Sequence, residues 1–419
     1  MTTALAVAPT SPSERVEIMD VLRGVALFGV FLVNLIQFAS VNIMATEAQL
    51  LSLPTAPADL TLFDVLGWLF FDKANTIFAF LFGLGFYLQM QRLEARGVDF
   101  DVIFFRRLCV LLVIGAIHVV FIWAWDILHL YALAGFALLA LRNVSNRDLF
   151  AFGVICAVVG RAMQKTLTEF TGLGTWTGDT DGYGEAAVLV RQQLSESGDY
   201  FGIVRNFLDW TVIDYLANGL IVGWFFYALG RFLIGAWVGR HGWIARAQDF
   251  LPQWRRVARW ALLLGLVFEG AATLLAESPL LPDWRHRQFL ADLTHLFAVP
   301  VLATGYIAGL ISLYHSRFGV RLLASFAWIG RMALTNYLMQ SLVIAFVLFG
   351  VGPGLALAGK IGTTALFGIV LVVYVAQMIF SRWWLGRFAY GPAEWVWRAL
   401  TYGKMPAMRL AEKGAAPVS

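Results

Sequence analysis

The segment WAWDILHLYAL (residues 123–133) places two titratable side chains, Asp126 and His129, inside a long apolar run. Their i, i+3 spacing brings them to one face of a helix, within contact distance. A carboxylate beside an imidazole fixes the ring tautomer and favours its protonation, whereas a dry environment opposes it. Such a pair could act as a general base or acid near neutral pH. The same spacing also suits a polar pair that only braces a helical hairpin.

Other polar side chains interrupt apolar segments along the chain. His118 is either a further catalytic candidate or a histidine that bonds one helix to another. An ionisable residue within a membrane span costs at least about 2.5–3.5 kcal/mol, so these groups should share one pocket that opens outward and reaches the midplane. Asp292 and His295, near the outer edge, could instead be a solvated helix start. Glu269, in the middle of a predicted span, belongs to these polar groups. The residues that we expect to bind substrate in the pocket are Asn34, Asp72, Lys73, Asp292 and His295.

Arginines gather at the predicted opposite ends of the spans. Asp20 and Arg23 open the first span in IMDVLRGVALFGV. Arginine presents several hydrogen-bond donors that suit phosphate, so an arginine ring could form an entrance for an anionic group. The alternative is the ordinary excess of basic residues on the cytoplasmic side. The candidate ring consists of Arg23, Arg106, Arg107 and Arg331.

The composition identifies the solvent that surrounds these residues. Of 419 residues, 59% are hydrophobic and 14% are charged, and the mean hydropathy is +0.72. Soluble domains carry about 45–50% apolar and about 25% charged residues, so this chain is a polytopic membrane protein. The net charge of +4 comes without a compact basic cluster, and no nucleic-acid partner is expected. Cys109 and Cys156 lie in apolar runs and indicate packing residues rather than a disulfide framework.

Apolar runs near 20 residues long predict an all-α bundle of about ten transmembrane helices. The run from Leu108 to Leu141 must be two spans, because about 34 residues of helix would reach roughly 51 Å. The break falls near Asp126, which makes a hairpin tip with Trp123 and Trp125 at a membrane interface. The predicted spans are 21–41, 62–90, 107–125, 127–141, 148–163, 210–239, 257–276, 288–314, 323–349 and 361–381.

The distribution of Lys and Arg predicts that both termini are cytoplasmic. Residues 1–20 form a short cytoplasmic segment without a cleavable signal, and residues 21–381 form the transmembrane domain. An external loop at about 164–208 contains a Gly-rich stretch and then a short amphipathic surface helix. Residues 382–419 form a cytoplasmic tail with interfacial aromatic and basic residues, and a lid over the cytoplasmic entrance is the competing interpretation.

Several catalytic signatures are absent from the sequence. It has no GxxxxGK[ST], HExxH or GxSxG pattern, and its histidines are too scattered to propose a metal site. No tightly bound cofactor is expected. The stretch FLFGLGF, around Gly83 and Gly85, favours close helix packing.

Five segments together carry a family resemblance that extends over nearly the whole chain. They are DVLRGVALFGVFLVN, KANTIFAFLFGLGFYLQMQR, RRLCVLLVIGAIHVVFIWAWDILHLYAL, IGRMALTNYLMQS and FAYGPAEWVWRALTYGK. In this order they resemble the YeiB-like bacterial inner-membrane proteins, which end in domain of unknown function 418. The tail is the most specific element. The resemblance implies a multi-pass protein of the bacterial inner membrane.

The opening DxLRG pattern, with Asp20 and Arg23, is also similar to that of transmembrane acyltransferases of the heparan-glucosaminide acetyltransferase type. This similarity implies transfer of an acyl group from cytosolic acyl-CoA to an envelope glycan or another periplasmic acceptor. The heparan-type enzymes use a histidine in the first external loop, which this chain lacks. His118 or His129 would take that role, with Asp126 beside it.

Other classes of function stay open. A transporter of a small polar or anionic solute could use the same outer pocket, and it should then show a repeat with paired broken helices. A non-enzymatic assembly or lipid-binding protein would leave the buried histidines without a chemical role. The expected partners are the lipid bilayer, acyl-CoA and an envelope acceptor, and a homo-oligomer is compatible with the sequence.

Overall fold

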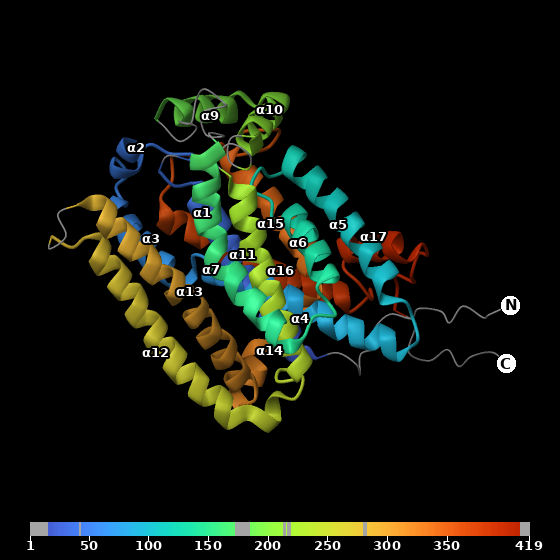
Figure 1. Ribbon diagram of the computed structural model, residues 1–419. Helices are drawn as coiled ribbons and strands as arrows, with labels where there is room; N and C mark the ends of the chain where they lie inside the picture. The colour runs from blue at the N-terminus through green and yellow to red at the C-terminus, as the bar shows by residue number, and fades with distance from the viewer. Residues whose placement is uncertain are drawn as a thin grey trace.

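The computed structural model describes residues 16–41, 43–171, 185–212, 215, 219–279 and 283–410. Within these ranges the chain is helical and has only isolated β-bridges, which confirms the all-α class (Figure 1). Residues 1–15, most of the Gly-rich stretch (172–184) and residues 411–419 lie outside the described part of the chain.

The helices follow one another with short connections. In chain order they are α1 (Glu17–Phe38), α2 (Glu47–Leu51), α3 (Ala56–Phe70), α4 (Lys73–Ala95), α5 (Phe100–Phe121), α6 (Leu128–Ala140), α7 (Asn146–Thr171), α9 (Glu185–Ser197), α10 (Tyr200–Thr211), α11 (Leu220–His241), η3 (Ala247–Phe250), α12 (Leu251–Ala276), α13 (Trp284–Tyr314), α14 (Arg317–Arg331), α15 (Ala333–Leu348), α16 (Thr363–Leu385) and α17 (Pro392–Tyr402).

Seven helical segments among the described residues are long and apolar enough to cross a membrane, or eight if α14 and α15 form one span. This confirms a polytopic membrane bundle, whereas the predicted number of about ten stays a prediction. α6 is apolar but shorter than these segments. The seven segments are α1, α3 with α4, α5, α11, η3 with α12, α13 and α16.

Two spans that the sequence predicted to be continuous are interrupted. The 62–90 span breaks between α3 and α4 at Asp72, whose backbone adopts the left-handed conformation with φ 62°. Aspartate tolerates this conformation better than most residues. The 323–349 span bends by 82° between α14 and α15, at Met332. The predicted break near Asp126 is confirmed, since α5 ends at Phe121 and α6 starts at Leu128.

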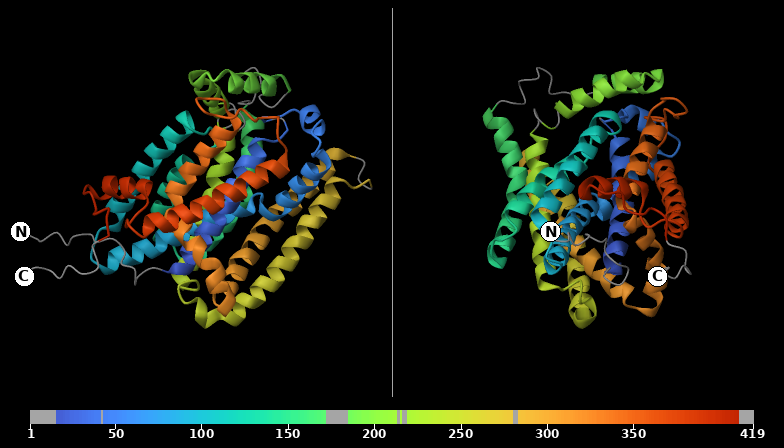
Figure 2. Two further views of the ribbon diagram at one scale, coloured as in Figure 1. Left: turned by 180° about the vertical axis from the view of Figure 1, so that it is seen from behind. Right: turned by 90° about the vertical axis from the view of Figure 1, so that its right-hand side faces the viewer.

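α1 runs through the middle of the bundle and contacts α4, α14, α15 and α16 (Figure 1). Two glycines allow it to cross α14 closely. A Cβ at Gly24 would lie 2.2 Å from the carbonyl oxygen of Phe326, and a Cβ at Gly330 would lie 1.8 Å from that of Asp20. The glycine of the DVLRG segment therefore serves helix packing. α12 and α13 form a hairpin along one side of this bundle (Figure 2).

The predicted amphipathic surface helix is present as α9, and α10 continues it across one end of the bundle (Figure 1). Ser195 joins α9 to the end of α15. Its hydroxyl donates to the carbonyl of Leu348 at 2.6 Å, and its carbonyl accepts from the amide of Gly350 at 2.8 Å. Trp123 is only 1% exposed and packs 4.0 Å from the ring of Phe38. Trp123 thus lies in the interior, in a cluster with residues of α1 and α10, and its depth at a membrane interface stays a prediction.

The crossing of α1 and α14 generates a test of the fold. Gly330→Ala should lower the free energy of unfolding by about 1–3 kcal/mol, because the new methyl group overlaps the backbone of α1. Thermal unfolding of the purified protein in detergent measures the effect. Gly309→Ala in α13 is the matched control, since a Cβ there meets no atom within 4 Å. Equal melting temperatures for the two variants would contradict the close crossing.

Candidate functional site

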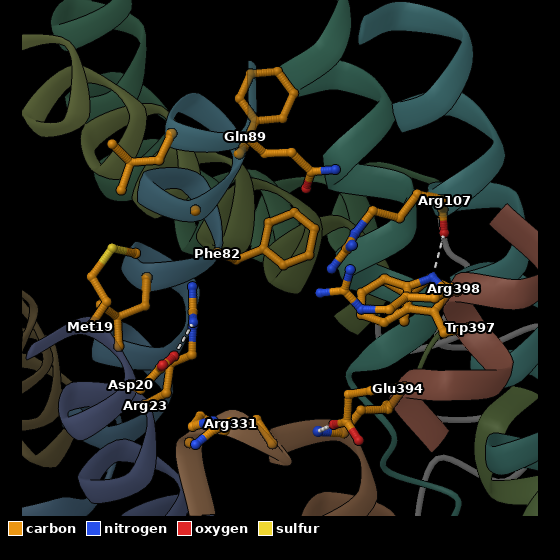
Figure 3. A pocket seen from close by; sticks show the side chains of 18 of the residues that line it. Met19, Asp20, Arg23, Phe82, Gln89, Arg107, Arg331, Glu394, Trp397 and Arg398 are labelled. Carbon is orange, nitrogen blue, oxygen red and sulfur yellow. Dashed lines mark hydrogen bonds and ion pairs between the residues drawn. The ribbon is translucent and has the colours of Figure 1, made fainter. Parts of the chain in front are cut away.

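A cavity of about 310 Å³ opens between α1, α4, α5, the α14–α15 bend and α17 (Figure 3). Apolar side chains such as Phe82, Phe86 and Leu111 form its walls, and Tyr337 lies among its lining residues. It is also rich in positive charge, which suits an anionic ligand with an apolar portion. The arginines that line it are Arg23, Arg92, Arg96, Arg107, Arg331 and Arg398.

Three of the four predicted arginines meet at this cavity. Arg23 donates to the carboxylate of Asp20 at 2.8 Å, one turn earlier on α1. Arg107 lies over the ring of Trp397, with its guanidinium carbon 3.7 Å from the ring centroid. Arg331 stands at the end of α14, beside the bend (Figure 3). Arg106 is exposed and is not among the cavity residues, because neighbouring residues of a helix point about 100° apart.

The C-terminal tail forms one wall of the cavity, because Glu394, Trp397 and Arg398 are among its lining residues. The indole of Trp397 donates to the carbonyl of Arg107 at 2.9 Å, which joins α17 to α5. Glu394 joins α17 to the start of α15. Its carboxylate accepts from the amides of Leu334 at 2.6 Å and Thr335 at 3.1 Å, and from the hydroxyl of Thr335 at 2.6 Å.

Glu394 thus caps a helix that starts about 60 residues earlier in the chain. Burial raises the pKa of this carboxyl above its ordinary value of 4.5, while the hydrogen bonds from Thr335 and Leu334 oppose that rise. Sequence reasoning assigned the tail to the membrane interface and missed this contact. The contact depends on the tertiary structure, which brings the tail close to the α14–α15 bend.

Next to the cavity, Asp126 forms a buried cluster with both candidate histidines. Its Oδ1 lies 2.9 Å from Nδ1 of His118, and its Oδ2 lies 3.0 Å from Nδ1 of His129. The hydroxyl of Tyr337 donates to Oδ1 at 3.2 Å, and that of Tyr215 donates to the Asp126 carbonyl at 3.1 Å. Asp126 is fully buried.

Local geometry holds this cluster in place. The amide of His129 donates to Oδ2 of Asp126 at 3.1 Å, so the carboxylate caps the first turn of α6 as well. Gly115 on α5 lets the start of α6 approach, since a Cβ there would lie 2.3 Å from that amide nitrogen. His118, one turn further along α5, then reaches the carboxylate from the other side.

Tyr337 connects the cavity to the cluster. It lines the cavity and donates to Asp126, and its ring lies 5.5 Å from that of His118. Leu128 and Tyr131, which flank His129 on α6, also line the cavity. The arginine-lined opening and the carboxylate–histidine cluster therefore lie on either side of one tyrosine.

Three of the five predicted substrate-binding residues form a second cluster with Glu269. Lys73 and His295 both bind Glu269, and His295 also reaches Asp72. Asp292 instead accepts from the amide of Gln288 at 3.0 Å, and Asn34 is half-buried on α1. The sequence predicted one shared pocket. The structure has two clusters, one joining α5, α6 and α15 and the other joining α4, α12 and α13.

These features define a class: a polytopic α-helical membrane protein with an arginine-lined cavity beside a buried aspartate–histidine cluster. Residues 238–404 match the family model described as "Protein of unknown function (DUF418)". Uncharacterized protein YxaH of Bacillus subtilis is 31% identical over 410 residues, which cover 94% of this chain and 96% of YxaH. Uncharacterized protein YeiB of Escherichia coli is 31% identical over 402 residues, which cover 93% and 96%.

The chain therefore belongs to the YeiB-like family, as its five segments indicated. No solved structure matches it significantly.

The Asp126 cluster generates a stability test. Asp126→Ala should lower the free energy of unfolding by about 3–5 kcal/mol, because it leaves two buried imidazoles without their shared partner. Tyr337→Phe removes one hydrogen bond to the same carboxylate and should cost about 1 kcal/mol. Thermal unfolding in detergent separates the two. A larger loss in the tyrosine variant would show that Asp126 does not hold the cluster.

The Glu394 cap generates a second test. Glu394→Ala should cost about 0.5–2 kcal/mol, the usual range for a lost helix cap. Protease digestion of the tail reports detachment of α17 from α15. Glu277→Ala, at the far end of α12, is a control without a cap contact to α15. Undiminished protection in Glu394→Ala would contradict the docking role.

The same carboxyl predicts a pH dependence. Its pKa is raised in the folded state, so its protonation contributes stability below the unfolded value of 4.5 that is lost as the pH rises through the folded pKa. The melting temperature of wild type relative to Glu394→Gln should therefore fall as the pH rises from about 4 to about 7. A constant difference over this range would contradict the raised pKa.

Proposed function

We propose that the protein is a transmembrane acyltransferase that takes an acyl group from acyl-CoA and delivers it to an envelope acceptor. One observation carries the proposal: Tyr337 lies between an arginine-lined cavity and the buried Asp126 cluster with its two histidines. In this proposal an anionic donor and a candidate base would occupy adjacent places in one fold.

The chemistry of the cavity suits an acyl-CoA donor. Arginine binds phosphate through several fixed donors, so Arg23, Arg107 and Arg331 would hold the phosphates of the donor. The apolar walls would accommodate the acyl-pantetheine arm, which would then extend toward Tyr337 and the start of α6, since both line the cavity. The proposal places this entrance on the cytoplasmic side of the bacterial inner membrane, where acyl-CoA is available.

His129 is the preferred base. Asp126 would accept a hydrogen bond from its Nδ1–H and so leave Nε2 free to take a proton. An acceptor hydroxyl or amine would give this proton to Nε2 as its oxygen or nitrogen attacks the thioester carbonyl. Breaking of the C–S bond would then release CoA, whose sulfur recovers the proton. The products are the acylated acceptor and CoA thiol.

The two histidines differ in how deeply they are buried. The side chain of His129 is 13% exposed, whereas that of His118 is 1% exposed. Neither ring nitrogen of His118 meets the geometry of a hydrogen bond within the described residues, although Nδ1 lies 2.9 Å from Oδ1 of Asp126. His118 would therefore hold Asp126 and Tyr337 in position, and His129 would meet the acceptor.

A second candidate function is transport of a small polar or anionic solute. The two interrupted spans favour it, since α3–α4 break at Asp72 and α14–α15 break at Met332. Discontinuous helices form the substrate sites of many transporters. In this alternative the cavity would bind the solute and no acyl bond would form.

The cavity arginines provide a test of donor binding. Arg107→Gln should weaken the binding of acetyl-CoA about tenfold or more, because a charged hydrogen bond contributes about 1.5–3 kcal/mol. Calorimetry on the detergent-solubilised protein measures the affinity. Arg106→Gln is the matched control, since the side chain of Arg106 is exposed and does not line the cavity.

Transfer is measured separately with labelled acetyl-CoA and an envelope extract. His129→Ala should abolish labelling of the extract, keep the affinity for acetyl-CoA and keep the melting temperature within a few degrees. Full labelling by this variant would remove His129 from the catalytic role. Binding without labelling by wild type, across several acyl-CoA donors, would favour transport.

A further inference from the structure

The second cluster is a continuous line of titratable groups across three helices. The side-chain nitrogen of Lys73 on α4 lies 2.5 Å from Oε1 of Glu269 on α12. The other oxygen of Glu269 lies 3.0 Å from Nδ1 of His295 on α13. Nε2 of His295 lies 3.3 Å from Oδ2 of Asp72, at the break before α4. Neither the arginine cavity nor the Asp126 cluster includes these groups.

The hydrogen-bond pattern identifies how the protons are placed. An ionised carboxylate is an acceptor only, and His295 faces a carboxylate oxygen with each ring nitrogen. Both nitrogens therefore carry a hydrogen in this arrangement. With Lys73 charged as well, two positive groups balance Asp72 and Glu269, and the line is neutral overall.

Accessibility changes in steps along this line. The side chain of Asp72 is 40% exposed and that of His295 is 28% exposed, whereas Glu269 is 5% exposed and Lys73 is fully buried. Asp72 is thus the accessible end and Lys73 the sealed end. An imidazolium that bonds to carboxylates on both sides can release the proton of one nitrogen, and the bare nitrogen can then take up another proton.

We propose that Asp72, His295 and Glu269 form a proton-binding relay, with Lys73 as a fixed positive charge at its inner end. His295 passes the proton on Nδ1 to Oε2 of Glu269 and becomes a neutral imidazole. The ring then turns over, and its bare Nδ1 takes the proton that Asp72 has bound from water. Asp72 is then a carboxylate again and His295 an imidazolium. Glu269 has become a neutral acid, and one positive charge has moved inward.

The other groups that face the line are held by separate bonds. Tyr227 on α11 donates to the carbonyl of Asp72 at 2.9 Å, and Tyr306 on α13 donates to the carbonyl of Leu69 at 3.0 Å. Arg231 bonds to the hydroxyl of Thr76 and stacks on Tyr227. Tyrosine and arginine titrate well above neutral pH, so the two carboxylates and His295 are the groups that exchange protons.

This inference is independent of acyl transfer, because that reaction consumes no net proton. Proton uptake would break the charge pairing of Lys73 with Glu269, which joins the α12–α13 hairpin to α4. The relay therefore couples the protonation state of Asp72 to the attachment of this hairpin.

Charge displacement in proteoliposomes tests the relay. The full-length protein is adsorbed on a solid-supported membrane, and the pH outside is stepped from about 8 to about 4, which covers the range in which histidine and carboxylates titrate. Inward movement of a proton through a low-dielectric region produces a transient capacitive current. Wild type should give this current, and Glu269→Gln should lose it, because an amide keeps the shape but takes no proton.

The control is a second histidine of α13 that also pairs with a carboxylate. His286 on α13 bonds to Asp283 at 2.8 Å with an exposed side chain, so His286→Gln should keep the current and His295→Gln should lose it. If Glu269→Gln alone does not fold, the double variant Lys73→Met with Glu269→Gln replaces it, because this variant leaves no ammonium group without its carboxylate. It should also give no current.

Two results would overturn the relay. One is the absence of a transient current from folded wild-type protein above that of protein-free liposomes. The other is a wild-type current in folded Glu269→Gln, in the double variant or in His295→Gln, which would show that the cluster only braces the α12–α13 hairpin.

Discussion

The free-energy cost of a charge in a low-dielectric environment governs this structure. Lys73 and Asp126 are fully buried, and each is held by groups from other helices. Breaking such a pair leaves an uncompensated charge, so these contacts fix the positions of the helices that carry them. Asp126 joins α5, α6 and α15, while Glu269 joins α12 to α4 and α13.

The same cost applies to backbone groups at the helix breaks. A span that stops inside the bundle leaves amide and carbonyl groups without partners in the helix, and these need others. Glu394 supplies acceptors to the first amides of α15, and Lys73 donates to the carbonyl of Gly67 at the end of α3. A charged side chain therefore serves each break: Glu394 reaches α15 from the tail, and Lys73 is the first residue of α4. The tail helix α17 is part of this arrangement.

The three polar regions differ in what they can do. The arginine cavity is open and positive, the Asp126 cluster is centred on one buried carboxylate, and the line from Asp72 to Lys73 runs from an accessible to a buried end. Tyr337 links the first two, which supports a joint role in binding and transfer. The third connects the peripheral α12–α13 hairpin to the bundle, which supports a role in proton binding and in the position of that hairpin.

The sequence by itself determined the class of fold and the contacts that depend on helix geometry. Composition required a membrane bundle, and the i, i+3 spacing paired Asp126 with His129 as the structure does. The tertiary structure alone decided which distant groups meet. Glu394 caps α15, His295 lies between Glu269 and Asp72, and Arg107 lines the cavity while Arg106 does not. The physical reason is the separation of the residues along the chain. The geometry of a helix fixes contacts between residues up to four positions apart, whereas contacts between distant residues depend on how the helices pack.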